Sequence, residues 1–410
     1  MGAPAAALML TVLHSADWQI GKPYARVHDP DKRARLRQAR IEAIGRIGAW
    51  LDQEQLPEQP AFLMVAGDLF DSPTPSSSDI TAVCQAIGKL AIPVLVIPGN
   101  HDHGAPGSVW HSPFFQSEQQ RRAPNLQVLL ERKPVLIGGA VVLPCPLLRR
   151  SDSSDPTDWV RQLDWKQLPT DHPRILLAHG SVHGFAAADL DADDDNPSSA
   201  NNRLELDAAL LDQLDYVALG DWHGLKQVNS RTWYSGTPEP DRFPRTDDYQ
   251  GGQVLKVQLQ RGGAPVVATI PTAALDWRQL NVQLNTAGDL ERLERQLEPL
   301  LQAEPGQQLL LLEQCGSLSL QAHQRYEQLL ERLEAQLLRL KRRGRIEQQP
   351  APEELELLRQ RAEDPLIARV AAELQAELEQ AAAANAAEQR QVLQLALAEL
   401  QRATGAAECA

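Results

Sequence analysis

The 410-residue chain has few cysteines, no long apolar run and no excess of basic charge, and each absence excludes a class of protein. The four cysteines, Cys84, Cys145, Cys315 and Cys409, are scattered and do not have the spacing of a metal-binding knuckle. No stretch reaches the roughly 18 apolar residues that a membrane-spanning helix requires, so we expect no membrane association. The formal net charge of −14 argues against broad, nonspecific binding to nucleic acid, which depends on a basic surface.

The start of the chain lacks the basic segment that precedes the apolar core of a secretory signal peptide. Scattered cysteines without a pairing pattern are typical of reduced thiols in a reducing compartment. We therefore expect a cytoplasmic protein. With 43% hydrophobic and 23% charged residues, the chain has ample apolar material for a globular core.

Aromatic residues are almost missing from the last third of the chain. All eight Trp, all six Phe and four of the five Tyr precede residue 281, and Tyr326 is the only aromatic after it. Single cores stop growing near about 250–300 residues, so a chain of this length predicts two or three domains. We predict an α/β domain over residues 1–275, a small capping α+β domain over 276–350 and C-terminal helices over 351–410.

Short apolar runs, each followed at once by polar residues, recur through the first domain. Runs of this kind indicate buried strands, and they occupy residues 8–13, 61–66, 93–98, 174–178 and 216–219. Helical segments are predicted between several of them, such as 31–51 and 78–90. This alternation indicates an α/β sandwich. In open α/β sheets ligands bind beyond the carboxyl ends of the strands, which is where the polar residues stand.

The capping domain is predicted to begin with a strand over residues 309–312. Apolar residues at helical spacing then predict a helix over 326–340. The basic residues 341–343 would stand at the end of that helix, with Gly344 as its cap.

Two further helices are predicted near the end of the chain. Asp364 as the N-cap and Pro365 in the first turn mark the start of one, and the other is expected over residues 386–402. The acidic stretch 189–195 is interpreted as a solvated loop, because its spacing does not match a calcium-binding EF-hand.

Five short segments, each after a predicted strand, carry carboxylates, amides or imidazoles. They are residues 14–19, 67–71, 99–102, 178–180 and 220–223. Two divalent metals about 3.5–4 Å apart need a shared anionic bridge and terminal ligands on either side. Asp68 can bridge, Asn100 offers a carbonyl oxygen, and His179 and His223 offer ring nitrogens. Neighbouring glycines let the backbone approach such a site, so the segments together point to a metal centre.

The Gly-Asp-x-x-Asp motif at residues 67–71 and the Gly-Asn-His-Asp motif at 99–102 follow strands in that order. In this the chain resembles the calcineurin-like metallophosphoesterase superfamily, and within it the SbcD-type DNA repair exonucleases, most clearly over residues 10–245. The resemblance implies a four-layer α/β/β/α sandwich with the metals at the strand ends, beside a smaller, mainly helical C-terminal α+β part. It also implies hydrolysis of a phosphodiester by a metal-activated water.

By motif position the resemblance implies two metal sites. The residues of the first would be Asp17, Asp68 and His223, with Gln19 as a further candidate ligand. The residues of the second would be Asp68, Asn100, His179 and Asp221. His101 would lie beside the scissile phosphate and protonate or stabilise the leaving oxygen, with Asp102 orienting its ring.

Two positions depart from the family pattern. Its first motif is Asp-x-His, and Gln19 stands where the His is expected. Its last motif is Gly-His-x-His, and Asp221 replaces the first His. Asp221 can still ligate a metal, whereas Gln19 is a weaker, neutral ligand or none, which weakens the first site. The shift toward oxygen ligands suits Mn²⁺ best, with Mg²⁺ as the alternative.

Other polar residues have competing interpretations. A single Asp or His is more often a cap or an ion-pair partner than a ligand, and Asp71 is interpreted as a turn or cap residue. His14, His103 and His183 are candidates for lining the pocket, although each is more often a core or surface residue. The segment 234–240 resembles one near the rim of the family's active site, or is simply a turn between two strands.

Three functions are open on this sequence. The first is a DNA exonuclease or endonuclease subunit in DNA repair. The second is a phosphodiesterase or phosphatase for small nucleotides, since the fold serves many phosphate esters. The third is a non-catalytic binding or regulatory subunit, which the Gln19 replacement supports. The long C-terminal part favours the first function, because a small-molecule enzyme does not require it.

The resemblance also implies a partner, an SMC-like ATPase of the SbcC type, and a homodimer is a further alternative. In that family a helical C-terminal region docks on the coiled coil of the ATPase. The apolar faces available for this are Ile367, Val370, Leu374 and Leu378, and then Val392, Ala396 and Leu400. The alternative is that both helices pack on their own domain.

Overall fold

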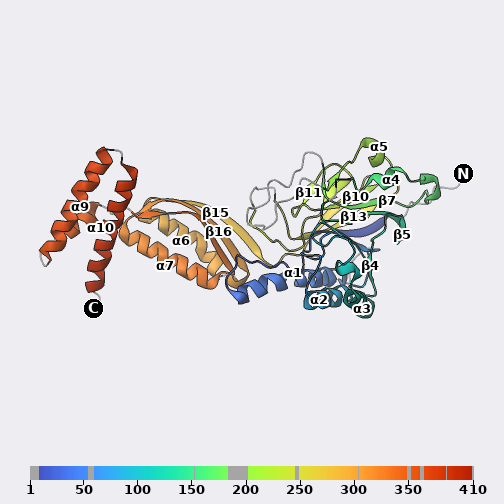
Figure 1. The fold of residues 1–410 in the computed structure, drawn as a ribbon, viewed down its shortest axis with the longest axis horizontal. Coiled ribbons are helices and arrows are strands. Elements are labelled where there is room, and N and C mark those ends of the chain that lie inside the picture. Colours follow the sequence, from blue (N-terminus) through green and yellow to red (C-terminus); the bar gives the residue numbers. More distant parts are fainter. Residues whose placement is uncertain are drawn as a thin grey trace. The chain divides into compact units, whose positions relative to one another are not determined.

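The computed structural model describes residues 9–53, 60–151, 153–182, 202–244, 249–302, 304–348, 352–360, 364–384 and 386–408 (Figure 1). Contacts divide it into two compact units, Met1–Asp276 and Trp277–Ala410. The acidic stretch 189–195, His183 and Cys409 lie outside the described residues. The three-part division expected from composition stays a prediction.

The first unit contains two six-stranded sheets, the first in the order β14-β13-β1-β2-β3-β4. Its strands are β1 (Leu10–Ser15), β2 (Leu63–Ala66), β3 (Val94–Ile97), β4 (Leu126–Val128), β13 (Gln253–Leu259) and β14 (Val266–Pro271). Strands β1 to β4 pair in parallel, whereas β13 pairs antiparallel with β1. The carboxyl ends of β1, β2 and β3 therefore meet at one edge of the sheet.

The second sheet has the order β11-β12-β10-β7-β6-β5. Its strands are β5 (Val135–Ile137), β6 (Ala140–Cys145), β7 (Arg174–His179), β10 (Tyr216–Gly220), β11 (Lys226–Gln227) and β12 (Thr232–Tyr234). Strands β6, β7, β10 and β12 pair in parallel, and the register places His179 opposite Gly220. A short parallel pair, β8 (Ser181–Val182) and β9 (Arg203–Leu204), stands outside this sheet.

Helices cover the outer faces of the two sheets, which confirms the predicted four-layer sandwich. Alternate residues of a strand point to opposite layers. Met64 and Ala66 of β2 lie in the core between the sheets, while Leu63 and Val65 lie in the core beneath the helices. The helices on the first sheet are α1 (Pro30–Leu51), α2 (Ser77–Ile87) and α3 (Pro113–Arg122), with the short η1 (Val109–His111). Those on the second are α4 (Asp158–Arg161), η2 (Trp165–Gln167) and α5 (Ala208–Leu211).

Local chemistry explains where α1 begins. The side chain of Asp29 accepts hydrogen bonds from the backbone N–H groups of Asp31 and Lys32, and Pro30 occupies the first turn, where its missing N–H costs nothing. The helix ends at Leu51, as predicted. One face of it, which includes Ile44 and Ile47, is buried against the first sheet.

The second unit contains the sheet β15-β16-β17, with β18 paired to β16. Its elements are β15 (Asp276–Leu284), α6 (Ala287–Gln302), η4 (Pro305–Gln307), β16 (Gln308–Leu318), α7 (Leu320–Gln336), β17 (Arg339–Gly344) and β18 (Glu347–Gln348). Leu290 and Leu297 of α6, together with Tyr326 and Leu333 of α7, pack against the sheet in one leucine-rich core. This core explains the aromatic-poor, leucine-rich composition of the region.

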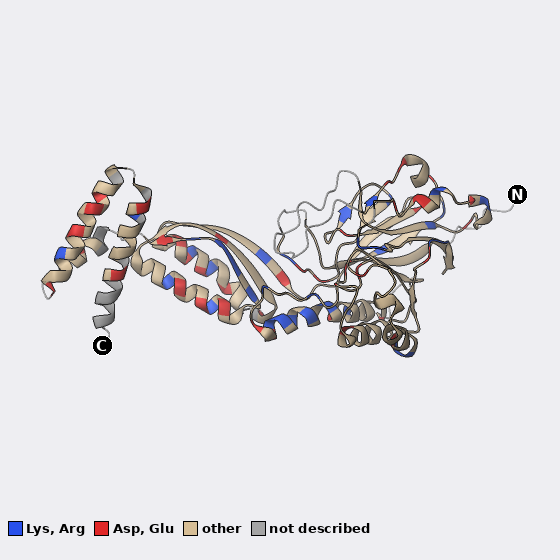
Figure 2. Ribbon diagram, viewed as in Figure 1, with Lys and Arg blue, Asp and Glu red and all other residues tan. Residues whose placement is uncertain are grey.

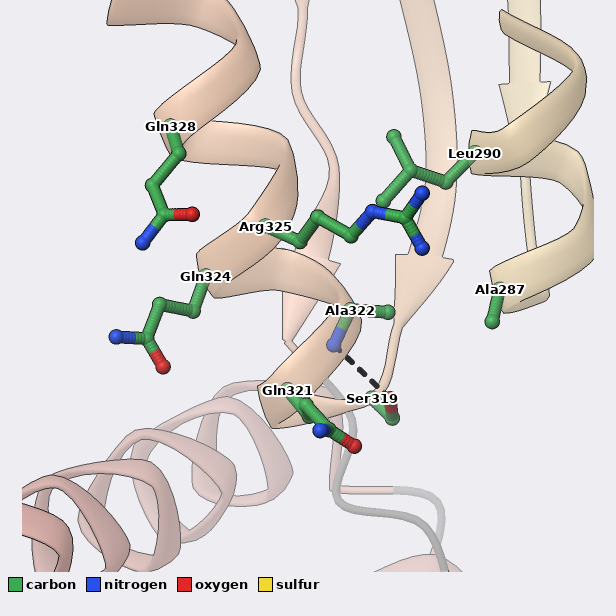
Figure 3. Close-up of a pocket in the computed structure, with 8 residues that line it drawn as sticks. All are labelled: Ala287, Leu290, Ser319, Gln321, Ala322, Gln324, Arg325 and Gln328. Carbon is green, nitrogen blue, oxygen red and sulfur yellow. Dashed lines mark hydrogen bonds between the residues drawn. The ribbon is translucent and has the colours of Figure 1, made fainter. Parts of the chain in front are cut away.

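A pocket with a volume of about 410 Å³ lies at the start of α7 (Figure 3). Ser319 caps the helix there, and its hydroxyl accepts a hydrogen bond from Ala322 N at 3.3 Å. Arg325 extends toward α6, where its guanidinium pairs with Glu294. Because a carboxylate already neutralises this guanidinium, the pocket is a gap beside an ion pair between two helices.

Residues 337–344 differ from the sequence prediction. The helix expected over 326–340 ends at Gln336, so the basic residues 341–343 lie on β17 and not at a helix end. This strand pairs in parallel with β16, where Leu310 stands opposite Leu340. From the strand, Leu340 packs against the same leucine-rich core as α6 and α7. Its apolar character therefore reflects burial, and its match to the helical spacing does not indicate a helix. Pairing with a leucine-rich strand outweighed the local helical preference.

Three helices end the described chain, α8 (Pro352–Arg359), α9 (Pro365–Ala383) and α10 (Ala387–Glu408). The predicted start of α9 is confirmed, because Asp364 O accepts a hydrogen bond from Ala368 N at 3.2 Å. Helix α10 runs past residue 402, where the prediction ended it. Within the described ranges, no helix is long and apolar enough to cross a membrane.

Candidate metal centre

Residues far apart in the sequence meet at the carboxyl ends of β1, β2, β3, β7 and β10. Asp17, Asp68 and His179 each place one ligand atom within 4.8 Å of the other two. Asn100 joins them through Oδ1, which lies 2.8 Å from His179 Nε2. Asp221 Oδ1 lies 3.8 Å from the same nitrogen. The two sheets therefore bring five of the predicted ligands into one cluster.

Four of the candidate residues have positive φ angles, a region that side chains other than glycine rarely adopt. The angle is 55° at Asp17, 41° at Gln19, 54° at Asp68 and 103° at Asp221. Asp17 N donates to Gly67 O at 3.1 Å, and Gln19 N donates to Asp68 O at 2.8 Å. These hydrogen bonds join the loop after β1 to the loop after β2. Such strain persists only where the surroundings over-determine the backbone, and it concentrates at functional sites.

Two glycines allow the ligands to approach the backbone. A Cβ on Gly67 would lie 2.2 Å from His179 Nδ1, and a Cβ on Gly99 would lie 2.1 Å from Asp68 Oδ1. Non-bonded atoms cannot approach so closely. Gly67 also has a φ of 89°, which favours glycine for a second reason. The glycines that stand beside the predicted ligands are therefore required by packing.

His179 is fully buried, and the backbone orients its ring. Nδ1 lies 2.8 Å from Ala66 O, and because a carbonyl only accepts, Nδ1 carries the proton and donates. Nε2 is then the nitrogen that faces Asp68, 3.6 Å away, and the other ligands. Burial disfavours a charge on the ring, but the surrounding carboxylates Asp68, Asp17 and Asp221 raise its pKa to about 9.

The carboxylates of the cluster are crowded together away from water. Burial raises the pKa of Asp17 to about 8; His179 opposes this, while Asp68 and Asp221 add to it. Burial also raises the pKa of Asp221. Burial acts in the same direction on Asp68, but His179 and His101 hold its pKa below the ordinary value. Like charges this close stay ionised together only beside positive charge.

The donors in this cluster fit a divalent cation. Asp17 and Asp68 supply carboxylate oxygens, His179 supplies a nitrogen whose other ring position is already fixed, and Asn100 and Asp221 add oxygens. A ring N–H bonded to a backbone carbonyl is the usual outer contact of a metal-binding histidine. An oxygen-rich set with one imidazole suits Mn²⁺ or Mg²⁺ better than softer ions.

A second cluster surrounds His223 and includes three charged residues. Gln19 Nε2 lies 3.3 Å from His223 Nε2, and Gln19 Oε1 lies 3.2 Å from Lys22 Nζ. At the other ring nitrogen, Nδ1 lies 3.0 Å from Asp241 Oδ2 and 2.9 Å from Arg242 Nη2. Burial lowers the pKa of His223 to about 4, although Asp241 opposes the shift. The ring is therefore neutral near pH 7.

The ring of His101 is held by Asp71 and not by Asp102. His101 Nδ1 donates to Asp71 O at 3.0 Å. The carboxylate of Asp102 instead accepts hydrogen bonds from Phe70 N at 3.1 Å and Gly99 N at 2.7 Å. The expectation that Asp102 orients the ring is therefore wrong, because this carboxylate ties two ligand-bearing loops together. The backbone of Asp71, interpreted from the sequence as a turn residue, supplies the orientation.

Arg40 of α1 is the main supporting residue that sequence reasoning missed. Its guanidinium is buried and donates to Trp18 O at 2.7 Å, Asp17 O at 2.9 Å, Glu239 O at 3.1 Å and Thr237 Oγ1 at 3.1 Å. One signal was available, since an arginine stands on the buried face of a helix. Thr237 and Glu239 belong to the segment 234–240, which was noted only as a rim or a turn.

Lys22, Asp241 and Arg242 were missed as well. Neither composition nor spacing marks them, because each touches the site only after folding. His14 is a core residue, since Nε2 lies 3.1 Å from Leu219 O and Nδ1 lies 2.9 Å from Tyr216 OH. For His103, no hydrogen bond to a candidate ligand occurs in the described part of the chain.

Residues 10–249, more than half of the chain, match the calcineurin-like phosphoesterase family. Among solved structures, that of TT1561 of Thermus thermophilus is 12% identical, and the match covers 64% of this chain and 99% of that one, with a TM-score of 0.36. A second solved structure is also 12% identical and matches 65% of this chain and 100% of its own length, with a TM-score of 0.37.

Proposed function

The chain belongs to the calcineurin-like phosphoesterase family, and from this premise we propose that it is a metal-dependent phosphodiester hydrolase of the SbcD type that cleaves DNA. Family membership implies metal-dependent hydrolysis of a phosphoester. The observation that carries the proposal is the buried group of Asp17, Asp68 and His179 at the strand ends, with Asn100 and Asp221 beside it. Mn²⁺ is the proposed metal, because oxygen ligands dominate this set.

The chain's own residues would position the substrate and handle the proton. When bound, a divalent cation would offset charge on the nonbridging phosphate oxygens and lower the pKa of the attacking water. His101 has its Nδ1 proton held by Asp71 O, and no described residue bonds its Nε2. The side chain is 20% exposed, so this nitrogen can hold the proton that the leaving oxygen takes up.

The basic charge on α1 supports a nucleic-acid substrate, although the chain as a whole is acidic. Basic residues crowd the first turns of this helix, shown in blue in Figure 2: Lys32, Arg33, Arg35 and Arg37. Basic charge at a helix start opposes the helix dipole, so helix stability does not explain it. We assign this basic stretch to contacts with DNA phosphates, beginning with Lys32 and Arg33 in its first turn.

Helix α1 also connects this basic segment to the metal centre. Arg40 donates to Asp17 O at 2.9 Å, so the middle of the helix is anchored to a ligand-bearing loop. With a rise of about 1.5 Å per residue, position 33 lies roughly 10 Å along the axis from position 40. A DNA backbone bound at Lys32 and Arg33 would therefore lie about 10 Å along α1 from the residue that holds this loop.

The helices α8 to α10 are the proposed docking site for an SMC-like ATPase of the SbcC type. The stripe predicted on α9, which includes Ile367 and Leu374, is only half-buried. Leu366, beside that stripe, is 71% exposed, and Val392, the first member of the stripe predicted on α10, is 60% exposed. Exposed apolar anchors on helices suit a helical partner such as a coiled coil.

The central experiment is an assay of the purified protein with Mn²⁺ on labelled single- and double-stranded DNA, beside a chromogenic phosphodiester and small nucleotides. Cleavage of DNA is expected, and Asp68→Ala should abolish it because the cluster loses its central carboxylate. Asp171→Ala is the matched control, since that carboxylate is 83% exposed. Undiminished activity of Asp68→Ala would refute the site. Cleavage of small nucleotides alone would favour the small-nucleotide enzyme, and metal binding without any activity would favour the regulatory subunit.

The DNA contact has a separate test. The double variant Lys32→Gln/Arg33→Gln should weaken DNA binding and reduce the slope of log affinity against log salt by about 2, because roughly one counterion is released for each phosphate contact. Turnover of the chromogenic ester should not change. The control Lys89→Gln/Lys133→Gln removes the same charge from two exposed positions elsewhere in the first unit. An equal effect of both double variants would show that only net charge matters.

The partner proposal is tested with the ATPase co-expressed. Leu366→Glu and Val392→Glu should each abolish co-purification and leave hydrolysis of the small ester intact, because both side chains are exposed. Leu136→Glu is the control, since Leu136 is 62% exposed in the first unit. Co-purification that survives both substitutions would remove the support for docking on these helices.

A further inference from the structure

The amide of Gln19 turns its nitrogen, and not its oxygen, toward His223. Lys22 Nζ lies 3.2 Å from one amide atom, and an ammonium only donates hydrogen bonds, so that atom is the oxygen. The other amide atom, Nε2, then lies 3.3 Å from His223 Nε2. An amide NH₂ group has no lone pair to give a metal ion. Gln19 therefore offers no ligand on the side where the sequence suggested one.

Both ring nitrogens of His223 are engaged as well. Nδ1 lies 3.0 Å from Asp241 Oδ2, which only accepts, and 2.9 Å from Arg242 Nη2, which only donates. Nε2 decides the tautomer, because it faces the NH₂ group of Gln19 and must accept; Nδ1 therefore carries the proton and donates to Asp241. Arg242 Nη2 donates to the same carboxylate oxygen at 3.1 Å. The lone pair of the neutral ring is then on Nε2, where the amide of Gln19 donates to it. One lone pair accepts either a hydrogen bond or a metal ion, so a metal ion at His223 would have to displace this amide, which offers it no ligand on that side.

The two clusters differ in the charged groups that surround them. Lys22 Nζ lies 2.7 Å from Asp241 Oδ2, and Arg242 Nε lies 3.0 Å from Asp241 Oδ1, so two fixed cations face one carboxylate. Asp17 Oδ1 also lies 4.0 Å from His223 Nε2, so a divalent ion there would have to share this carboxylate with the first cluster while it faces the two cations. The cluster of Asp17, Asp68, Asp221 and His179 holds three carboxylates around one imidazole. Its excess of carboxylates needs a cation.

We propose that this chain holds one divalent cation, at Asp17, Asp68 and His179, and that Gln19 and Lys22 close the second position expected at His223. The inference deepens the proposed function and rests on it. The ammonium of Lys22 supplies fixed positive charge in the part of the centre where the resemblance implied a second metal. Replacing Gln19 by His is not enough to restore that metal, because Lys22 remains paired with Asp241.

The test is the number of Mn²⁺ ions bound, measured on the full chain by titration calorimetry and by elemental analysis after gel filtration. Electron paramagnetic resonance is an independent readout, since a lone Mn²⁺ ion and a coupled pair about 3.5–4 Å apart give different spectra. The wild type should bind one equivalent with a mononuclear spectrum. The double variant Gln19→His/Lys22→Met should bind two and show coupling. Lys89→Met is the matched control and should bind one.

The outcomes separate this inference from the proposed function. Two equivalents with a coupled spectrum in the wild type would overturn the single-ion proposal and leave the hydrolase proposal standing. A folded double variant that stays at one equivalent would show that Gln19 and Lys22 are not what closes the second position, and would also overturn it. No binding of Mn²⁺ by the wild type would overturn the inference and the proposed function together.

Discussion

Arg40→Met tests whether the ligand-bearing loop is held from α1. The arginine side chain is buried, and its guanidinium donates four hydrogen bonds, three to backbone carbonyls and one to a hydroxyl. Methionine keeps much of the apolar stem and removes every donor. Glu239 O keeps one partner, the hydroxyl of Thr237 at 2.9 Å. Asp17 O and Trp18 O lose the side-chain donor that Arg40 gives them.

The magnitude follows from those two carbonyls. Leaving a buried carbonyl unsatisfied costs about 1–3 kcal/mol, so the variant should lose about 2–6 kcal/mol of unfolding free energy. The lower half of that range is expected, because removing a buried charge also removes its desolvation cost. Asp17 has a φ of 55°, and a loosened carbonyl lets this strained residue relax. Loss of such outer support typically weakens metal binding about 10–100-fold, which we expect for Mn²⁺.

Urea unfolding followed by tryptophan fluorescence measures the first effect, since every tryptophan except Trp277 lies in the first unit. Titration calorimetry with Mn²⁺ measures the second. Arg35→Met is the control on the same helix, because that side chain is 32% exposed and its ion pair with Glu42 is worth about 0–1 kcal/mol. An Arg40→Met protein as stable as the control, with unchanged Mn²⁺ affinity, would refute the reasoning.

Three further substitutions probe the site and the core. His101→Gln should lower turnover about 10²–10⁴-fold with Mn²⁺ content unchanged; loss of metal by elemental analysis would contradict a role as proton donor. Gly67→Ala places a Cβ 2.2 Å from a ligand ring, so it should lower the melting temperature and the metal content, whereas Gly45→Ala meets no atom within 4 Å and should do neither. Burial lowers the pKa of His14 from 6.5 to about 3, so below pH 6.5 the unfolded chain binds the extra proton. Stability should therefore fall by about 1.4 kcal/mol per pH unit as the pH drops through that window. His14→Gln should lack this contribution, and a pH-independent difference between the two proteins would show that the imidazole is not buried neutral.

The sequence was sufficient to predict the sandwich and most of the cluster, because both follow from local order. Asp68 and Asn100 come directly after short apolar runs, and these runs became β2 and β3, which pair in parallel. Parallel strands end at the same edge, so residues placed after them must come together. The start of α9 was predictable for a similar reason, since Asp364 and Pro365 act within their own turn. Where neighbouring residues in the sequence determine the local structure, the sequence pattern is enough to predict it.

Other features depended on contacts that only the folded chain makes. Lys22 and Asp241 are 219 positions apart, and their ion pair determines which end of the Gln19 amide faces His223. The motif suggested that Asp102 accepts a hydrogen bond from the ring of His101, but the carbonyl of Asp71 accepts it. The acceptor is the group that lies in the right geometry after folding, and not the neighbour in the sequence. Residues 339–344 formed a strand although their spacing continued a helix, because β16 offered backbone partners and a buried face. Burial and pairing are properties of surfaces that meet after folding, and no local pattern specifies which surfaces those are.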